Sequence, residues 1–211
     1  MGPHLKKFSR DECFAIAVAC SIDANALLGT QRHRWKRDQV EILRDSGAIN
    51  VEKLELIDGE LYDKSGEPRL HVNARHQAAI RLGKVFGIDR VVQHCTVSIA
   101  TEDRLFNDPE VDLIVTESCL EAYRNWPGPA DVLLLAEVSD VTLAFDLVEK
   151  ARLYTHAGFT EYWVVDLIGR RLIVHRGPAA ERYSSIVSYD VGESVAPLAA
   201  PDSRVAVASL F

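Results

Sequence analysis

The sequence predicts one α/β domain in which helices flank a central mixed sheet. Short apolar runs of strand length alternate with longer stretches of helical periodicity between residues 54 and 207. The chain has 211 residues, of which 47% are hydrophobic, so it is long enough and apolar enough to bury a single core. Strands with interspersed helices of this kind are typical of α/β and α+β domains.

Composition narrows the classes of function. A formal net charge of −7 gives the chain no broad positive field, which argues against a constitutive nucleic-acid binder but leaves room for an enzyme with one local basic face. No apolar run reaches the roughly 20 residues that cross a bilayer, and Asp11 and Glu12 interrupt the only stretch resembling a signal peptide. The four cysteines form no CxxC pair, which fits reduced thiols and predicts a cytoplasmic protein without a membrane partner.

The first part of the chain is predicted to be an addition to the main domain. Residues 1–31 have near-helical spacing of apolar side chains, and we expect a helical extension there, followed by the domain over 32–211. The basic run "RHRWKR" surrounds Trp35. It is either the solvated start of a helix or a patch that contacts phosphates, and the sequence leaves both interpretations open.

The main domain can be divided into elements from its patterns and breakers. A helix from Arg37 to Asp45 should end at Gly47, and a hairpin over 53–63 should turn at Asp58-Gly59. The stretch "HVNARHQAAIRLGKVFG" predicts a helix that ends at Gly87. The remaining predictions are strands at 91–99, 111–115, 132–138, 161–165, 171–175, 186–189 and 205–207, and a helix over 145–157.

Two acidic residues stand out because they interrupt apolar strands. Glu137 follows the run "LLLA", and Asp112 lies at the start of "DLIV". A carboxylate is costly to bury unless a partner or a metal compensates it. Two carboxylates at the ends of neighbouring strands would suit Mg²⁺, for which Mn²⁺ may substitute, and a water on such an ion could attack a phosphodiester.

A lysine would complete a hydrolytic site by stabilising the charge that develops on the phosphate. The usual place for it is two residues after the glutamate, but Ser139 stands there. Lys150 is the substitute that the sequence offers, four residues after Asp146 and on the same helix face. An exposed i,i+4 pair of no functional consequence is the competing interpretation.

Several segments, taken together, resemble a known family. From about residue 33 to the end, the chain is similar to the Uma2 family of the PD-(D/E)xK, restriction-endonuclease-like superfamily. The similar segments, in order, are "LELIDGEL", "RHQ", "PEVD", "AEVSD", "FDLVEKARLYTHAGFTEYWVVD" and "VAVASLF". The resemblance implies a restriction-endonuclease-like mixed sheet flanked by helices, with a Mg²⁺-dependent nuclease site.

The resemblance also implies roles for individual residues. Asp112 matches the aspartate of the PD motif, with Val111 in place of the proline, and Glu137 matches the acidic residue of the next strand. These two would bind the metal, and Lys150 would stabilise the transition state or orient the attacking water. Glu60 and His76 match further recurring polar positions and are secondary candidates.

Two hypotheses of function follow. The first is a metal-dependent endonuclease that hydrolyses DNA, a reaction in which a homodimer would supply one site for each strand. The second is a catalytically inactive interaction or regulatory module that keeps the fold. Ser139 at the usual lysine position, the altered PD motif and the acidic net charge favour the second.

Overall fold

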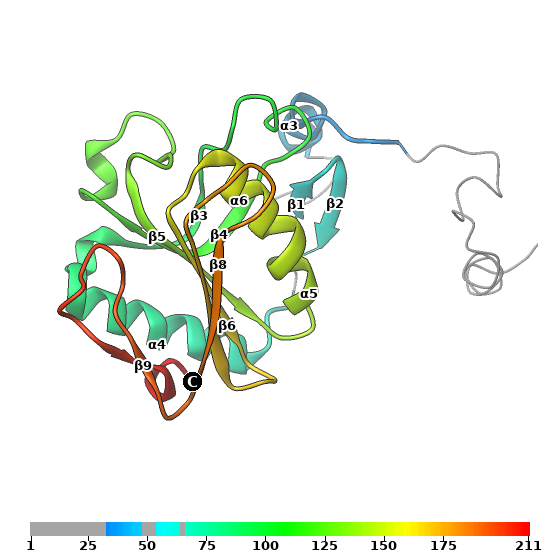
Figure 1. Cartoon of the computed structure of the whole chain (residues 1–211). Coiled ribbons are helices and arrows are strands. Elements are labelled where there is room, and N and C mark those ends of the chain that lie inside the picture. The colour runs from blue at the N-terminus through cyan, green and yellow to red at the C-terminus, as the bar shows by residue number, and fades with distance from the viewer. Residues whose placement is uncertain (1–32, 48–53, 64–65) are drawn as a thin grey trace, which may run out of the picture. The chain divides into compact units, whose positions relative to one another are not determined.

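A six-stranded mixed sheet forms the centre of the domain, as predicted (Figure 1). The structure is a computed structural model that describes residues 33–47, 54–63 and 66–211, so the predicted extension over 1–31 lies outside the described residues. The strand order is β3-β4-β5-β6-β7-β8, in which only β5 and β6 are parallel. The strands are β3 (Val91–Thr96), β4 (Glu110–Thr116), β5 (Val132–Ser139), β6 (Glu161–Asp166), β7 (Arg171–Arg176) and β8 (Ser185–Asp190).

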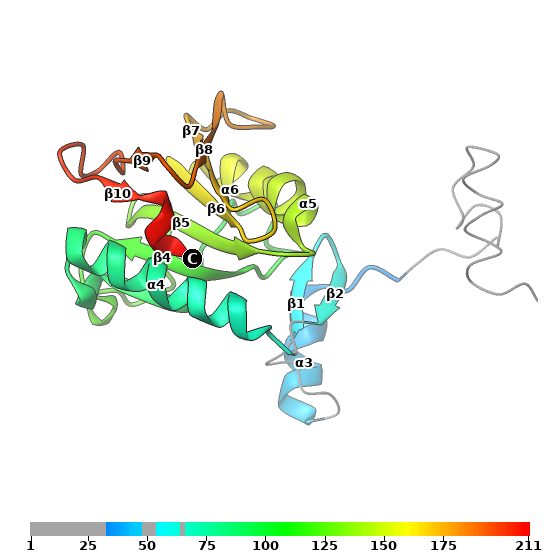
Figure 2. The ribbon, with the colours of Figure 1, turned by 90° about the horizontal axis from the view of Figure 1, so that it is seen from below.

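Helices cover both faces of this sheet (Figure 2). On one face, α4 (Arg69–Phe86) packs its small residues Ala74, Ala78 and Ala79 against the central strands, and the short η5 (Val207–Leu210) lies beside it. The other face is covered by α5 (Leu143–Phe145), η4 (Asp146–Lys150) and α6 (Ala151–Ala157), which connect β5 to β6. Strands buried on both faces need continuous apolar sequences, which explains the runs in β5 and β6.

The helix predicted over 145–157 is present but irregular. It begins at Leu143, and its Asp146–Lys150 segment is a π-helical turn rather than an α-helix. Single π turns inside α-helices are rare and occur frequently at functional sites. Gly158, with φ 93°, ends α6 in the left-handed region, as expected of a C-cap glycine.

A small hairpin and a helix lie at one end of the sheet. Helix α3 (Arg37–Ser46) ends at Gly47, and β1 (Leu54–Ile57) pairs with β2 (Glu60–Asp63) across the Asp58-Gly59 turn, both as predicted. Both residues of the turn have positive φ, which is typical of the tight hairpin turn that this dipeptide favours. Leu56 bridges to Asp108, which fixes the hairpin just before β4.

The remaining elements are short. They are η2 (Ile88–Arg90), η3 (Leu120–Ala122), β9 (Ser194–Val195) and β10 (Val205–Ala206), and the last two pair with each other. The strand predicted at 91–99 ends earlier, at Thr96, and the one at 205–207 gives way to η5 after Ala206. In the part of the chain that the structure describes, no helix is both long and apolar enough to cross a membrane.

One buried histidine in the sheet makes stability depend on pH. His175 is 1% exposed, stacks at 5.2 Å from the ring of Tyr162, and burial lowers its pKa to about 4. Between that pKa and the ordinary value of 6.5, the unfolded chain holds a proton on this ring that the folded chain excludes. Stability is therefore lost as the pH falls through this window.

We expect wild type to lose about 2 kcal/mol of unfolding free energy through His175 between pH 7.5 and pH 5. The His175→Leu variant should lack this part of the pH dependence, because it has no ring to protonate. Urea unfolding at the two pH values measures it, with the exposed His76→Leu as the control. Equal losses in wild type and His175→Leu would contradict the prediction.

Candidate functional site

A buried lysine joins the hairpin, the sheet and the crossover helix, by which we mean the segment α5–η4–α6 that connects β5 to β6. Lys150 is 5% exposed, and its Nζ lies 2.9 Å from Oε1 of Glu137 and 3.0 Å from Oε1 of Glu55. The same ammonium donates to the carbonyl oxygen of Glu110 at 3.0 Å. All three partners come from different strands, β5, β1 and β4. The interpretation of Lys150 as a solvent-exposed pair residue is therefore wrong.

The residue at the usual lysine position anchors the helix that carries Lys150. Ser139 donates from Oγ to Oδ2 of Asp146 at 2.6 Å, and Thr142 donates to the same oxygen at 2.9 Å. The Tyr162 hydroxyl donates to the carbonyl oxygen of Asp146 at 3.1 Å. These hydrogen bonds hold Asp146, the first residue of η4, in place. The π turn that follows then brings Lys150 to face Glu137.

Glu137 is 3% exposed and uses both carboxylate oxygens. Oε1 accepts hydrogen bonds from Lys150 and from the Tyr154 hydroxyl at 3.0 Å, while Oε2 accepts from the Asp112 backbone N–H at 3.1 Å. In return, Oδ2 of Asp112 accepts from the Val138 N–H at 2.9 Å. The β4–β5 ladder stops at the Leu113–Ala136 pair, and the two carboxylates satisfy the backbone groups just beyond it.

This cluster holds more negative charge than one lysine compensates. Burial lowers the pKa of Lys150, but Glu137 and Glu55 outweigh it and raise that pKa well above its usual value, so the ammonium stays charged. Burial raises the pKa of Glu137 well above its usual value, and the nearby Asp112, Asp146 and Glu55 carboxylates act in the same direction against Lys150. The folded site is therefore short of positive charge.

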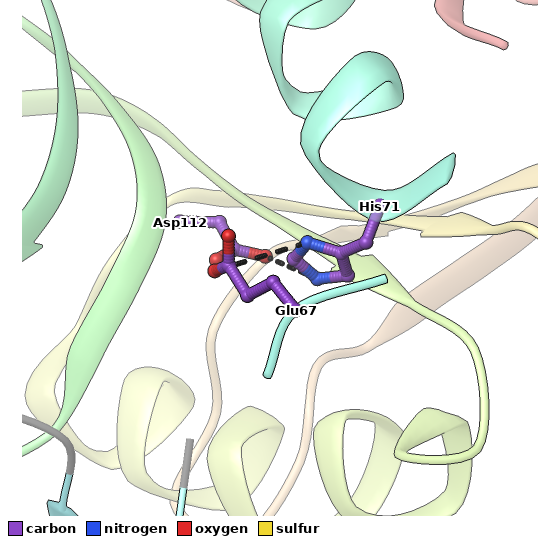
Figure 3. A group of neighbouring side chains, drawn as sticks. All are labelled: Glu67, His71 and Asp112. Atoms are coloured by element: carbon purple, nitrogen blue, oxygen red, sulfur yellow. Dashed lines mark ion pairs between the residues drawn. The ribbon is translucent and has the colours of Figure 1, made fainter. Parts of the chain in front are cut away.

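Asp112 extends the site toward the start of α4 (Figure 3). Nε2 of His71 lies 3.3 Å from Oδ2 of Asp112, and Nη1 of Arg75 lies 3.8 Å from Oδ1. Arg75 also pairs with Oε1 of Glu67 at 2.6 Å. Glu67, His71 and Asp112 each offer one ligand atom, and these three atoms all lie within 4.8 Å of one another.

The charges around Asp112 favour its ionised form. Burial raises the pKa of Asp112, but the hydrogen bond and charge of His71 and the charge of Lys150 lower it to about 2. Burial lowers the pKa of His71, while the Asp112 hydrogen bond and the Asp112 and Glu67 charges raise it above its usual value. Asp112 is thus an anion at neutral pH, as a metal ligand must be.

The secondary candidates lie elsewhere. His76 is exposed on α4, because it is five residues after His71 and falls on a different face from the buried Arg75, Ala78 and Leu82. Glu60 is half-buried on β2, where it accepts from the Tyr62 hydroxyl at 3.2 Å. A role for either in the site stays a prediction.

Sequence reasoning missed four residues of the site. The sequence predicts Glu55 only as part of the hairpin, although its neighbour in space is Lys150, and it predicts no role for Tyr154, which donates to Glu137. Both contacts join segments far apart in the sequence, so local patterns gave no signal. Glu67 and His71 could have been found, since His71, Arg75, Ala78 and Leu82 follow helical spacing along one face.

The fold and the site define a class of protein. A mixed sheet that brings an aspartate and a glutamate to the ends of adjacent strands, with a lysine on the glutamate, is the arrangement expected of a restriction-endonuclease-like protein. The sequence model of Uma2, described as "Putative restriction endonuclease", matches residues 36–208. The chain belongs to the Uma2 family.

A solved structure supports the fold. The chain is similar to a protein of known crystal structure from Anabaena variabilis ATCC 29413, which is described as a putative nuclease belonging to DUF820. The TM-score is 0.56 and the sequence identity is 14%. The similarity covers 75% of this chain and 89% of that one. No curated protein matches the chain.

Removing the buried lysine should destabilise the fold. Lys150→Ala leaves Glu55 and Glu137 buried without their cation, and breaking such a pair costs about 3–5 kcal/mol of unfolding free energy. Glu137→Gln removes surplus charge as well as an acceptor, so we expect a smaller loss. Urea unfolding measures both, with the exposed Lys84→Ala, expected within about 0.5 kcal/mol of wild type, as the control. A loss for Lys150→Ala no larger than the control's would contradict the buried network.

Proposed function

We propose that this protein is a Mg²⁺-dependent endonuclease that hydrolyses DNA phosphodiester bonds. The observation that carries the proposal is the buried Lys150–Glu137 pair beside the ionised Asp112. A buried lysine held by carboxylates at the end of two strands is costly for stability alone, and such groups concentrate at functional sites. Family membership supports a nuclease, and the metal and the residue roles are our proposal.

The residues present fit a divalent cation. Asp112 offers a carboxylate oxygen to a hard ion, and Glu67 and His71 beside it would add one carboxylate and one imidazole. Glu137 lies outside this group of three, and its oxygens accept from Lys150, Tyr154 and the Asp112 N–H. Nδ1 of His71 is buried and finds no hydrogen-bond partner in the described part of the chain. The surplus negative charge around Glu137 gives a cation a further reason to bind. We propose Asp112 and Glu137 as its main ligands.

Each residue then has a distinct chemical task. A bound Mg²⁺ would polarise the phosphate and lower the pKa of a coordinated water. Lys150 cannot bind the metal, because an ammonium offers only donors, but it places a fixed positive charge beside Glu137 for the charge that develops on the phosphate. Tyr154 donates to Glu137 and, together with Lys150, holds its carboxylate in one orientation.

Two further parts of the proposal concern the assembly and the alternative. A homodimer would bring one site to each strand of a duplex, and it stays a prediction. The competing hypothesis, an inactive interaction module, predicts no metal-dependent cleavage at all. Ser139 at the usual lysine position favours that module. The contact of Lys150 with Glu137 weakens this argument, because the helix brings to Glu137 the positive charge that position 139 lacks.

Metal binding tests the ligands. We expect Asp112→Ala and Glu137→Ala each to lower Mn²⁺ affinity in titration calorimetry, since each removes a carboxylate oxygen ligand. His71→Ala should lower Mn²⁺ affinity more than Mg²⁺ affinity, because imidazole suits transition metals better. His76→Ala, on the same helix, is the matched variant. Unchanged affinity in both carboxylate variants rules out this metal site, and equal losses in the two histidine variants would assign His76 a part in it.

Cleavage tests the lysine. In single-turnover assays at saturating Mg²⁺, we expect wild type to cut DNA and Lys150→Met to lose about 10²–10³ in rate while it retains metal binding. Lys150→Arg should rescue poorly, because a planar guanidinium does not replace a compact ammonium in a tight site. Asp146→Ala should lose less rate than Lys150→Met if Asp146 only positions the helix.

Wild-type cleavage that Lys150→Met leaves unchanged would remove the lysine from the mechanism. Wild type that binds metal but cuts no DNA form would instead favour the inactive module. Circular dichroism of each variant is the control, and a spectrum like that of wild type excludes misfolding as the cause of lost cleavage.

A further inference from the structure

A cleft next to the candidate site combines arginines with exposed aromatic rings. It has a volume of about 630 Å³, and we call it the Arg–Trp cleft after five of its lining residues, Arg37, Arg104, Arg124, Tyr123 and Trp126. That volume lies in the range of small-ligand sites. Three arginines line the cleft on a chain with a net charge of −7, and because Asp108 and Glu41 pair with Arg37, the positive charge of the cleft comes from Arg104 and Arg124.

The backbone of the cleft is fixed, while its side chains are available to a ligand. Ser98 donates from Oγ to the Trp126 carbonyl at 2.8 Å, yet the Trp126 residue is 51% exposed. The Tyr123 hydroxyl accepts from the Ser118 N–H at 2.9 Å, which holds that ring. A large aromatic side chain exposed on a rigid backbone suits stacking against a planar ligand.

The arginines are positioned in a similar way. Arg37 Nη2 pairs with Asp108 Oδ1 at 3.0 Å, and Arg104 donates from Nε to the Ile99 carbonyl at 3.0 Å. Arg37 Nε also lies 3.5 Å from Glu41 Oε1. A guanidinium carries five donors, so donors remain on both arginines for a phosphate. Arg124 is exposed next to Tyr123. Arg37 ends the basic run "RHRWKR", and its place in the cleft supports the phosphate-contacting interpretation of that run.

The sheet places this cleft close to Asp112. Gln93 pairs with Leu113 and Cys95 with Val111, so His94 lies opposite Asp112 on the neighbouring strand. Thr96, which also lines the cleft, pairs with Glu110, two residues before Asp112 and the residue whose carbonyl binds Lys150. A nucleic-acid strand at the site could therefore reach the cleft.

We propose that the Arg–Trp cleft binds an unpaired segment of the nucleic-acid substrate, with bases stacked on Trp126 and Tyr123 and phosphates on the arginines. Inside a duplex, base faces are stacked on each other and cannot meet a protein ring. The preferred substrate would then carry single-stranded nucleotides a few steps from the cut. The inference rests on the proposed nuclease function for its biological meaning, but binding can be measured without cleavage.

The test measures binding in EDTA, where no metal-dependent cleavage occurs. Fluorescence anisotropy of labelled oligo-dT, oligo-U and a mixed-sequence duplex is compared for wild type, Trp126→Ala and Arg124→Ala. We expect single strands to bind more tightly than the duplex and Trp126→Ala to raise Kd about tenfold, because stacking on a ring is lost. Arg124→Ala should also flatten the slope of log Kd against log salt by about 0.7, the value for one phosphate contact on a single strand.

Matched controls change exposed residues on other elements. Arg182→Ala removes an exposed arginine from the β7–β8 connection at the opposite edge of the sheet, and Ile168→Ala removes a side chain that is 72% exposed in the β6–β7 turn. Both should bind oligo-dT as wild type does. The comparison of oligo-dT with oligo-U decides between DNA and RNA as the source of the strand.

The outcomes separate this inference from the proposed function. Single-strand binding that both cleft variants leave at the wild-type level, or a duplex preference in wild type, overturns the role of the cleft even if Mg²⁺-dependent cleavage is found. Cleft-dependent binding without cleavage in Mg²⁺ leaves the cleft standing and overturns the nuclease.

Discussion

The whole site depends on the buried ammonium of Lys150. Its three partners lie on β1, β4 and β5, so a single side chain joins the hairpin to two central strands and to the crossover helix. Two hydrogen bonds and an ion pair, each at 3.0 Å or less, offset part of the cost of burying this charge. Without it, Glu55 and Glu137 would lie in the core without the cation that compensates them.

The crossover helix is built to deliver this lysine. In a common arrangement of the superfamily, the lysine comes from the same strand as the glutamate. Here Ser139 occupies that position and binds Asp146, while the π turn of η4 brings Lys150 back over the strand. Ser139, Asp146 and Lys150 thus act as one unit, in which the hydrogen bond between Ser139 and Asp146 determines the position of Lys150.

The sequence predicted the sheet and its helices well, because buried strands and amphipathic helices follow local periodicity. The turn residues Asp58-Gly59 and the helix-ending Gly47 were equally predictable, since their conformations favour few residue types. Glu137 could be recognised from the sequence as a carboxylate inside an apolar strand, but the residues that bind it could not. Glu55 is 95 residues from Lys150, and only the tertiary fold joins them. The π turn also escaped prediction, since a difference of one residue in hydrogen-bond spacing leaves the apolar pattern almost unchanged.

The distribution of charge connects the two parts of the proposal. A site with surplus carboxylates repels phosphate, so an acidic protein needs a separate source of attraction before a substrate strand can approach. A divalent cation would neutralise the surplus beside Asp112 and Glu137, and the arginines of the neighbouring cleft would hold the strand a few nucleotides away. Asp108 links the two regions, because it pairs with Arg37 of the cleft and lies two residues before Glu110, whose carbonyl binds Lys150. Binding and chemistry would then be divided between two adjacent sites of opposite charge.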